Sequence, residues 1–141
     1  MGEVGANPEI LELVGLWSAG AGYYATFSDE WMIFRPDGTG RLVFLNPFDD
    51  DSHHFRWRVV ASGVIDLIGS GKREPQGNEQ AGGSNEFHFI GVRYSVAEAE
   101  RPPGTGNWMR ELHLDLTGPW PDDLGFVSND YQAAEARLRS G

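Results

Sequence analysis

Residues 29–60 decide the fold class of this chain and read DEWMIFRPDGTGRLVFLNPFDDDSHHFRWRVV. β-forming residues dominate the stretch and alternate between two faces, as in strands with a buried side. Residues 36–40, PDGTG, reverse the chain, because proline presets φ and glycine accepts positive φ. The acidic run at residues 49–51 predicts a second reversal. Three strands joined by two short turns make an antiparallel meander.

The rest of the chain continues this meander. One strand is expected to open at Gly15, and four more are predicted at residues 64–68, 86–96, 108–116 and 124–127. A long antiparallel sheet with an apolar face tends to close into a barrel and so lose its edges. We therefore predict an all-β fold, a single up-and-down antiparallel barrel of about eight strands.

A short helix is expected at each end of the barrel. Asn7 and Pro8 suit the N-cap and the first helical position of the first helix. Ser128 or Asn129 is expected to cap the second helix, in which Tyr131, Ala134 and Leu138 follow helical spacing.

The 141 residues fit one domain, 1–141. Residues 1–6 are expected to be a loose tail. Residues 69–85, GSGKREPQGNEQAGGSN, are almost wholly polar and are expected to form a mobile loop. Between residues 86 and 96 the expected faces are Phe87, Phe89 and Gly91 on one side and Ile90, Val92 and Tyr94 on the other.

The net charge of -10 argues against nucleic acid and anionic membranes as partners, since both would be repelled. The chain has no cysteine, which excludes disulfides and thiolate metal sites. Its N-terminus, MGEVGANPEI, lacks the features of a signal peptide, and together these points favour the cytoplasm. A monomer or a homodimer is expected.

Gly15-Leu16-Trp17 follows the expected helix directly and opens the chain of strands. This G-x-W arrangement resembles the lipocalin and calycin superfamily, in which the tryptophan plugs the closed end of a barrel. The resemblance implies an arginine packed over Trp17, for which Arg110 and Arg93 are the candidates. It also implies a barrel that binds small molecules, although the TDY-like motif of the family is not evident.

Residues 17–24, WSAGAGYY, are similar in outline to the glycine-rich first strand of a heme-binding barrel family. Ala25 stands where that family has proline, and its later motifs are not apparent. This resemblance makes heme the one cofactor to consider, and no other cofactor is expected.

Strand parity places seven aromatic side chains inside the barrel: Trp31, Phe44, Phe55, Trp57, Phe87, Phe89 and Trp108. Such residues either fill a barrel of this size or line one small cavity in it. The second alternative gives a pocket for an apolar or planar molecule. Its candidate ligand-binding residues are Tyr24, Trp31, Phe44, Trp57, Phe89, Trp108 and Arg110.

Arg110 is in phase with the apolar residues of its strand, so the pleat places it inside. A buried guanidinium needs a carboxylate, a carbonyl or an aromatic face. Arg110 either stacks on Trp17 or pairs with an acidic or enolate group of a ligand. Arg35 lies beside the turn at residues 36–40 and is expected to be exposed.

The histidines do not predict a metal site. His53 and His54 are adjacent, so in a strand they point to opposite faces. If one histidine is internal, it is His53, which is in phase with Phe55 and Trp57.

Three functions stay open. The first is binding of a small apolar or aromatic molecule inside the barrel. The second is a cyclase or isomerase without a metal, in which Arg110, Tyr24, Asp66 or Glu86 polarises the substrate. The third is an acidic module that binds a basic protein.

Overall fold

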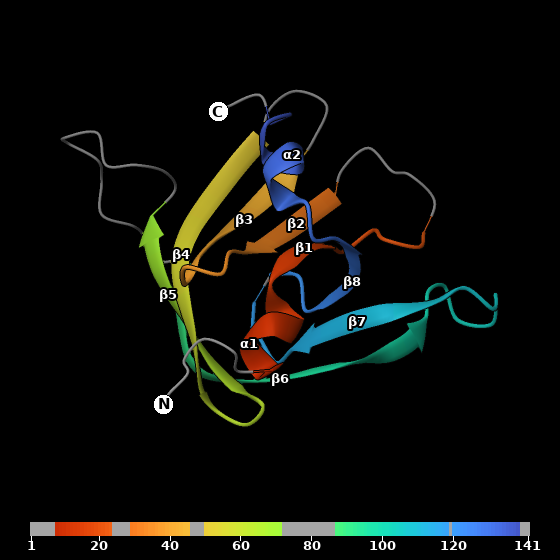
Figure 1. Ribbon diagram of the computed structural model, residues 1–141, viewed down its shortest axis with the longest axis horizontal. Coiled ribbons are helices and arrows are strands. Elements are labelled where there is room, and N and C mark those ends of the chain that lie inside the picture. Colours follow the sequence, from red (N-terminus) through yellow and green to blue (C-terminus); the bar gives the residue numbers. More distant parts are fainter. Residues whose placement is uncertain (1–7, 24–28, 46–49, 72–86, 119, 139–141) are drawn as a thin grey trace.

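The computed structural model describes residues 8–23, 29–45, 50–71, 87–118 and 120–138. It confirms the predicted fold class, because eight antiparallel strands follow one another around a closed barrel and the last pairs with the first. The strands are β1 (Gly15–Ser18), β2 (Asp29–Phe34), β3 (Thr39–Leu45), β4 (Asp50–Ala61), β5 (Val64–Gly71), β6 (Phe89–Glu100), β7 (Trp108–Leu114) and β8 (Asp123–Ser128). In Figure 1 they form a ring, and α1 (Pro8–Leu13) lies across it in this view.

Several strands extend beyond the predicted ranges, and β6 continues to Glu100, into the loop expected after residue 96. β4 begins at Asp50, so Asp51 pairs with Phe44 of β3 rather than lying in a turn. β5 continues to Gly71 because its pairing with β4 extends that far, which takes three residues from the loop expected at residues 69–85. Residues 72–86, and the expected tail at residues 1–6, lie outside the described residues.

A bulge in β6 overturns the predicted assignment of faces between residues 86 and 96. Phe89 pairs with Leu67 and Val92 with Ile65, so β6 holds one residue more than β5 between these two pairs. Gly91 lies in this interval with a φ of 70°, which glycine adopts without strain. Residues on both sides of the bulge therefore face the same core, whereas Ile90 is 62% exposed.

Trp17 closes the barrel core at the end where α1 enters β1. Its side chain is fully buried, and its indole N–H donates to the Leu13 carbonyl at 2.9 Å. Phe126 packs edge-on against it with 5.2 Å between ring centroids. The Arg110 guanidinium lies 4.1 Å from the Phe126 ring centre and 5.7 Å from that of Trp17. Arg110 therefore stacks on aromatic rings here, one of the two roles that the sequence predicts.

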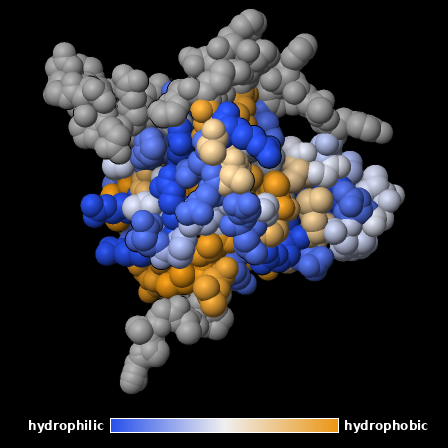
Figure 2. Space-filling model, turned by 45° about the horizontal axis from the view of Figure 1, so that its top comes forward, coloured by the Kyte–Doolittle hydropathy of each residue, from blue (hydrophilic) through white to orange (hydrophobic). Residues whose placement is uncertain are grey.

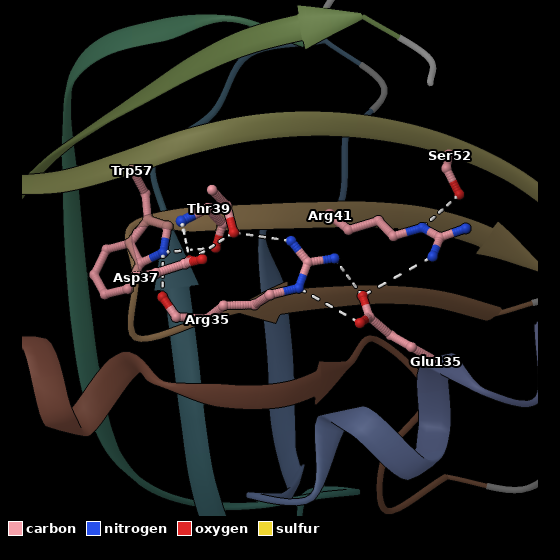
Figure 3. A network of polar contacts seen from close by, with 7 residues as sticks. All are labelled: Arg35, Asp37, Thr39, Arg41, Ser52, Trp57 and Glu135. Atoms are coloured by element: carbon pink, nitrogen blue, oxygen red, sulfur yellow. Dashed lines mark hydrogen bonds and ion pairs between the residues drawn. The ribbon is translucent and has the colours of Figure 1, made fainter. Parts of the chain in front are cut away.

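Trp57 lies inside the barrel near the turn between β2 and β3. Its ring packs edge-on against Phe34 at 5.2 Å. Its indole N–H is shared between the carbonyls of Arg35 and Thr39, at 3.1 and 3.0 Å (Figure 3). The predicted inward position of Trp57 is confirmed, and its one polar atom serves to anchor the turn.

The predicted inward position of Trp31 is wrong. Trp31 packs on the outer surface of the barrel with Leu16 and Ile33, beneath Tyr131 and Ala134 of α2 (Tyr131–Glu135). Because α2 covers this surface, β2 is apolar on both faces and its alternation does not reveal which face is internal. The cap of α2 is Asp130, one residue later than expected, and its side chain accepts from the Ala133 amide.

Salt bridges fasten α2 to the sheet (Figure 3). Arg35 donates through two nitrogens to the Glu135 carboxylate and through Nη1 to the Thr39 hydroxyl at 3.0 Å. Arg41 lies 3.9 Å from the same carboxylate and donates to the Ser52 hydroxyl at 2.9 Å. The Arg35 side chain is only 23% exposed, so the expectation of an exposed arginine is wrong. Glu135 supplies the partner, 100 residues away in the chain.

Arg101 ties the turn after β1 to the end of β6. It is 3% exposed and lies on the outer side of the sheet. Its guanidinium donates to the carbonyls of Ala19 and Ala21, both at 2.8 Å, and to the Glu111 carboxylate at 2.6 Å. The Tyr23 ring lies over it at 5.1 Å. The partners of this buried charge therefore come from the turn after β1 and from β7.

The surface is mostly polar in the view of Figure 2, with an apolar area at the lower edge of the described residues. The two helices have six and five residues, and no helix of the described residues is long and apolar enough to cross a membrane.

Candidate functional site

Five rings meet at one end of the barrel interior, and we call this group the Trp120 cage: Phe44, His53, Phe87, Phe89 and Trp120. The Trp120 ring lies at the centre of the group. Its centroid is 5.2 Å from His53 and from Phe87, 6.1 Å from Phe44 and 6.4 Å from Phe89. Three of these four contacts are edge-to-face, the arrangement that aromatic rings prefer.

The topology explains why these residues meet. In an up-and-down barrel the odd-numbered strands all end at the same rim, which we call the Trp120 end. Phe44 lies near the end of β3, His53 near the start of β4 and Phe89 at the start of β6. Trp120 comes from the connection between β7 and β8, which leaves the barrel wall at the same rim.

Two carboxylates flank Phe44 on the inner face at this rim. Glu30 of β2 and Asp51 of β4 are its cross-strand partners, and directly opposed residues share a face of the sheet. The inward direction of this face is shown by Met32, the next residue of β2 with the same parity, which is fully buried in the core. Asp51 Oδ2 also lies 3.9 Å from His53 Nε2. The Trp120 end therefore combines aromatic rings with negative charge.

Glu30 is half-buried, and burial raises the pKa of its carboxyl group above the ordinary value. The negative charge of the neighbouring Asp29 raises this pKa further. Asp29 itself points to the outer side, where it accepts from the Ser18 hydroxyl at 2.7 Å and from the Gly20 amide at 2.9 Å. Within the described residues, no hydrogen bond or ion pair holds the Glu30 side chain.

A histidine–aspartate pair links β7 to β8 where the connection that carries Trp120 begins and ends. His113 of β7 and Asp123 of β8 are 2.7 Å apart, and both side chains are about half exposed, at 51% and 52%. The hydrogen bond to Asp123 raises the pKa of His113, and the nearby carboxylates of Asp122 and Asp115 add to this effect.

This pair predicts a pH dependence of stability. Because the pKa of His113 is raised in the folded state, its stabilising effect is complete below the unfolded pKa of 6.5 and is lost as pH rises through the folded pKa. The exposure of both groups limits the effect to at most about 1 kcal/mol. Urea unfolding of the native protein and of His113→Gln should therefore differ more at about pH 5.5 than at about pH 8.5. When Asp123→Asn is already present, the effect of His113→Gln on stability should no longer depend on pH. An equal effect of His113→Gln at both pH values in the otherwise native protein would show that the pair with Asp123 does not raise the pKa of His113.

Two of the predicted ligand-binding residues, Phe44 and Phe89, lie together in the Trp120 cage. His53, the histidine expected to be internal, is 8% exposed and belongs to the same group. Phe55 and Phe87 are also buried as predicted, and their rings are 5.3 Å apart.

The other predicted ligand-binding residues lie elsewhere. Trp57 is buried beside the β2–β3 turn, Trp31 is outside the barrel under α2, and Arg110 stacks near Trp17. Trp108 has inward parity but is 60% exposed, and it lies at the very start of β7, before the residues that pair with β8. Tyr24 lies outside the described residues.

Sequence reasoning missed Trp120 and Glu30. Trp120 lies in Gly118-Pro119-Trp120-Pro121, which looks like a strand break, and a connection has no periodicity that reveals burial. A tryptophan between two prolines is the available signal, since prolines stiffen the segment that presents it. The alternation of the strand could have placed Glu30 on the inner face, because Glu30 is in phase with Met32 and Phe34.

The described residues contain no group of three or more histidine, aspartate or glutamate side chains that could hold a metal ion. Asp66, one of the acids considered for catalysis, points to the outer side of β5. There it accepts from the Gly91 amide at 2.9 Å and from Arg58 at 3.1 Å, and these bonds lower the pKa of its carboxyl group. Its role is to hold the bulge of β6 in place.

The chain matches no protein-family model, no curated protein and no solved structure.

Proposed function

We propose that this protein is a lipocalin-like binding barrel that takes up a small apolar or aromatic molecule at the Trp120 end. The observation that carries the proposal is the Trp120 cage, in which four rings surround the indole of a residue that belongs to no strand. A planar ligand that takes the place of this indole regains the same ring contacts. Each aromatic pair contributes about 0.5–1.5 kcal/mol beyond the burial of its area.

The opposite end of the barrel supports this choice of entrance. There Trp17, Leu13 and Phe126 pack together, and Trp57 satisfies its indole N–H on the backbone. Entry at that end would break buried contacts that hold the turn and α1. At the Trp120 end, within the part of the chain that the structure describes, the ring that has to move is that of Trp120, which a connection carries.

Heme would need an axial ligand for its iron, and His53 is the one histidine on the inner face of the described strands. The His53 ring stands edge-on to both Phe44 and Trp120, at 5.8 and 5.2 Å, and the ligand that we propose is an apolar or aromatic molecule smaller than a porphyrin.

No observation on the described residues favours an enzyme over a binding protein. Arg110 is engaged with two rings and Asp66 with the Gly91 amide, whereas Tyr24 and Glu86 lie outside the described residues.

The test is titration with N-phenyl-1-naphthylamine, a neutral aromatic probe that becomes fluorescent in apolar sites. The native protein should bind it, and Trp120→Ala should bind it about tenfold more tightly, because the indole no longer competes for the cage. Trp108→Ala is the matched control, since it removes an exposed tryptophan at the start of β7, at the opposite rim from the Trp120 end, and it should leave the affinity unchanged. If only Trp120→Ala binds the probe, the substitution has merely created a cavity and the proposal is wrong.

A further inference from the structure

The indole N–H of Trp120 has different surroundings from those of the two tryptophans buried in the barrel core. The N–H groups of Trp17 and Trp57 both donate to backbone carbonyls. The Trp120 N–H donates to no group of the described residues, and it is not closed off from solvent. A donor that reaches water needs no acceptor in the protein, whereas a buried one does. This edge of the Trp120 indole therefore faces the mouth of the barrel.

The connection between β7 and β8 carries the indole into the cage from the rim. Gly118 is exposed, and a Cβ atom there would lie 3.6 Å from both Cδ1 and Nε1 of Trp120. These two atoms, and the carbon that joins the indole to Cβ, all belong to the five-membered ring, so this ring faces the connection. The six-membered ring therefore reaches inward, toward the most deeply buried part of the cage. Phe87 lies there, 1% exposed and 5.3 Å from the Phe55 ring of the core.

We infer that the ligand of the Trp120 cage is a fused two-ring aromatic molecule that enters ring-first and carries its substituent on the edge facing the mouth. This inference rests on the proposed function and adds the size and orientation of the ligand to it. The four surrounding rings accommodate an indole, at centroid distances between 5.2 and 6.4 Å. The bond that joins this indole to the chain marks the path along which a substituent can leave the cage.

The two edges of such a ligand have different surroundings. A substituent on the mouth edge takes the place of the Trp120 backbone and stays in contact with water. A substituent on the opposite edge would press on the Phe87 ring, and extra atoms in a closely packed interior force its side chains out of their preferred positions. A polar substituent is disfavoured there further, because it would leave water for an apolar place. The cage therefore selects the position of the substituent on the ring.

Two isomeric neutral alcohols test the inference: tryptophol, which is indole-3-ethanol, and indole-6-ethanol. The first carries its substituent on the mouth edge, and the second carries it on the opposite edge. Each competes with bound N-phenyl-1-naphthylamine. Tryptophol should displace the probe at about tenfold lower concentration than indole-6-ethanol. Methylation of the ring nitrogen of tryptophol should change its affinity by less than about threefold, because the N–H at this position has no acceptor in the cage.

Phe87→Leu tests the inner wall of the cage, because a smaller side chain makes room beside the inner edge of the ligand. It should reduce the preference for tryptophol to below about threefold by strengthening the binding of indole-6-ethanol. Phe126→Leu is the matched control, since Phe126 packs against Trp17 at the other end of the barrel, and it should preserve the preference. The comparison of the two isomers on the native protein needs neither variant, so the test stays valid if Phe87→Leu fails to fold.

The outcomes separate the two proposals. A protein that binds the probe but does not distinguish the isomers, or prefers indole-6-ethanol, overturns the inference and leaves the binding barrel intact. A loss of affinity of about threefold or more on methylation of the ring nitrogen also overturns it, because the indole N–H would then have an acceptor in the cage. A protein that binds neither the probe nor either isomer overturns the proposed function itself.

Discussion

Replacing Trp17 with alanine is expected to lower the free energy of unfolding by about 3–5 kcal/mol, the range for a fully buried tryptophan. Trp17 has no exposed surface, and its ring packs against both Phe126 and the Arg110 guanidinium. Truncation removes these contacts, leaves a cavity and deprives the Leu13 carbonyl of its donor. Urea unfolding followed by far-ultraviolet circular dichroism measures the loss.

Two further variants separate the hydrogen bond of the Trp17 indole from its packing, and the effect of a buried tryptophan from that of an exposed one. Trp17→Phe keeps a ring in the core but loses the indole N–H, so it should cost about 1–3 kcal/mol from the unsatisfied Leu13 carbonyl together with some lost packing. Trp108→Ala removes an exposed tryptophan and should change stability by less than about 0.5 kcal/mol. Equal effects of Trp17→Ala and Trp108→Ala would show that Trp17 does not close the core.

Replacing Arg101 with alanine is expected to cost about 3 kcal/mol, the lower end of the range for breaking a buried ion pair. The lower end applies because Glu111 is 28% exposed and can be hydrated when its partner is lost. The carbonyls of Ala19 and Ala21 lose their donors at the same time. Gly125 shows how tightly the site is built, because a Cβ atom there would lie 2.8 Å from Arg101 Nε.

Arg101→Lys tests whether geometry matters as well as charge. Lysine keeps the charge but lacks the planar fork that reaches three acceptors at once, so its stability should fall between those of the native protein and the alanine variant. Arg93→Ala, at an exposed arginine of β6, is the matched control and should change stability by less than about 0.5 kcal/mol. If Arg101→Ala is as stable as Arg93→Ala, the turn after β1 does not depend on Arg101.

The fold was predictable because its main signals are local. Alternation and turn residues within residues 29–60 define three strands, and the same signals recur down to β8. Barrel closure then follows from one apolar face and the need to cover the edges. Phe44, Phe89 and His53 were placed on the correct face because each lies in a regular part of its strand, in phase with its neighbours.

The rest of the site depends on contacts that alternation does not encode. The outer face of β2 can carry the apolar Trp31 because α2, about 100 residues later in the chain, covers that face. The alternation within β2 alone therefore assigns Trp31 to the wrong face. Gly91 shifts the phase of β6 by one residue, which no pattern in that strand reveals. Trp120 lies in a connection, where burial is set by the tertiary fold and has no period.

The pairing of β1 with β8 has a consequence for how the barrel forms. Every other pair of neighbouring strands is consecutive in the chain, whereas Leu16 and Ser128 are 112 residues apart, since 128 − 16 = 112. Joining them closes a loop of almost the whole chain, and the entropy cost of closure rises by about 0.6 kcal/mol for each doubling of loop length. β1 has only four residues with which to offset that cost. Ala134 of α2 packs with Leu16 of β1, and Glu135 of α2 pairs with Arg35, directly after β2. These contacts lie close to the junction of β1 and β8, so α2 stabilises the closed barrel by holding the first strands to the C-terminal part of the chain.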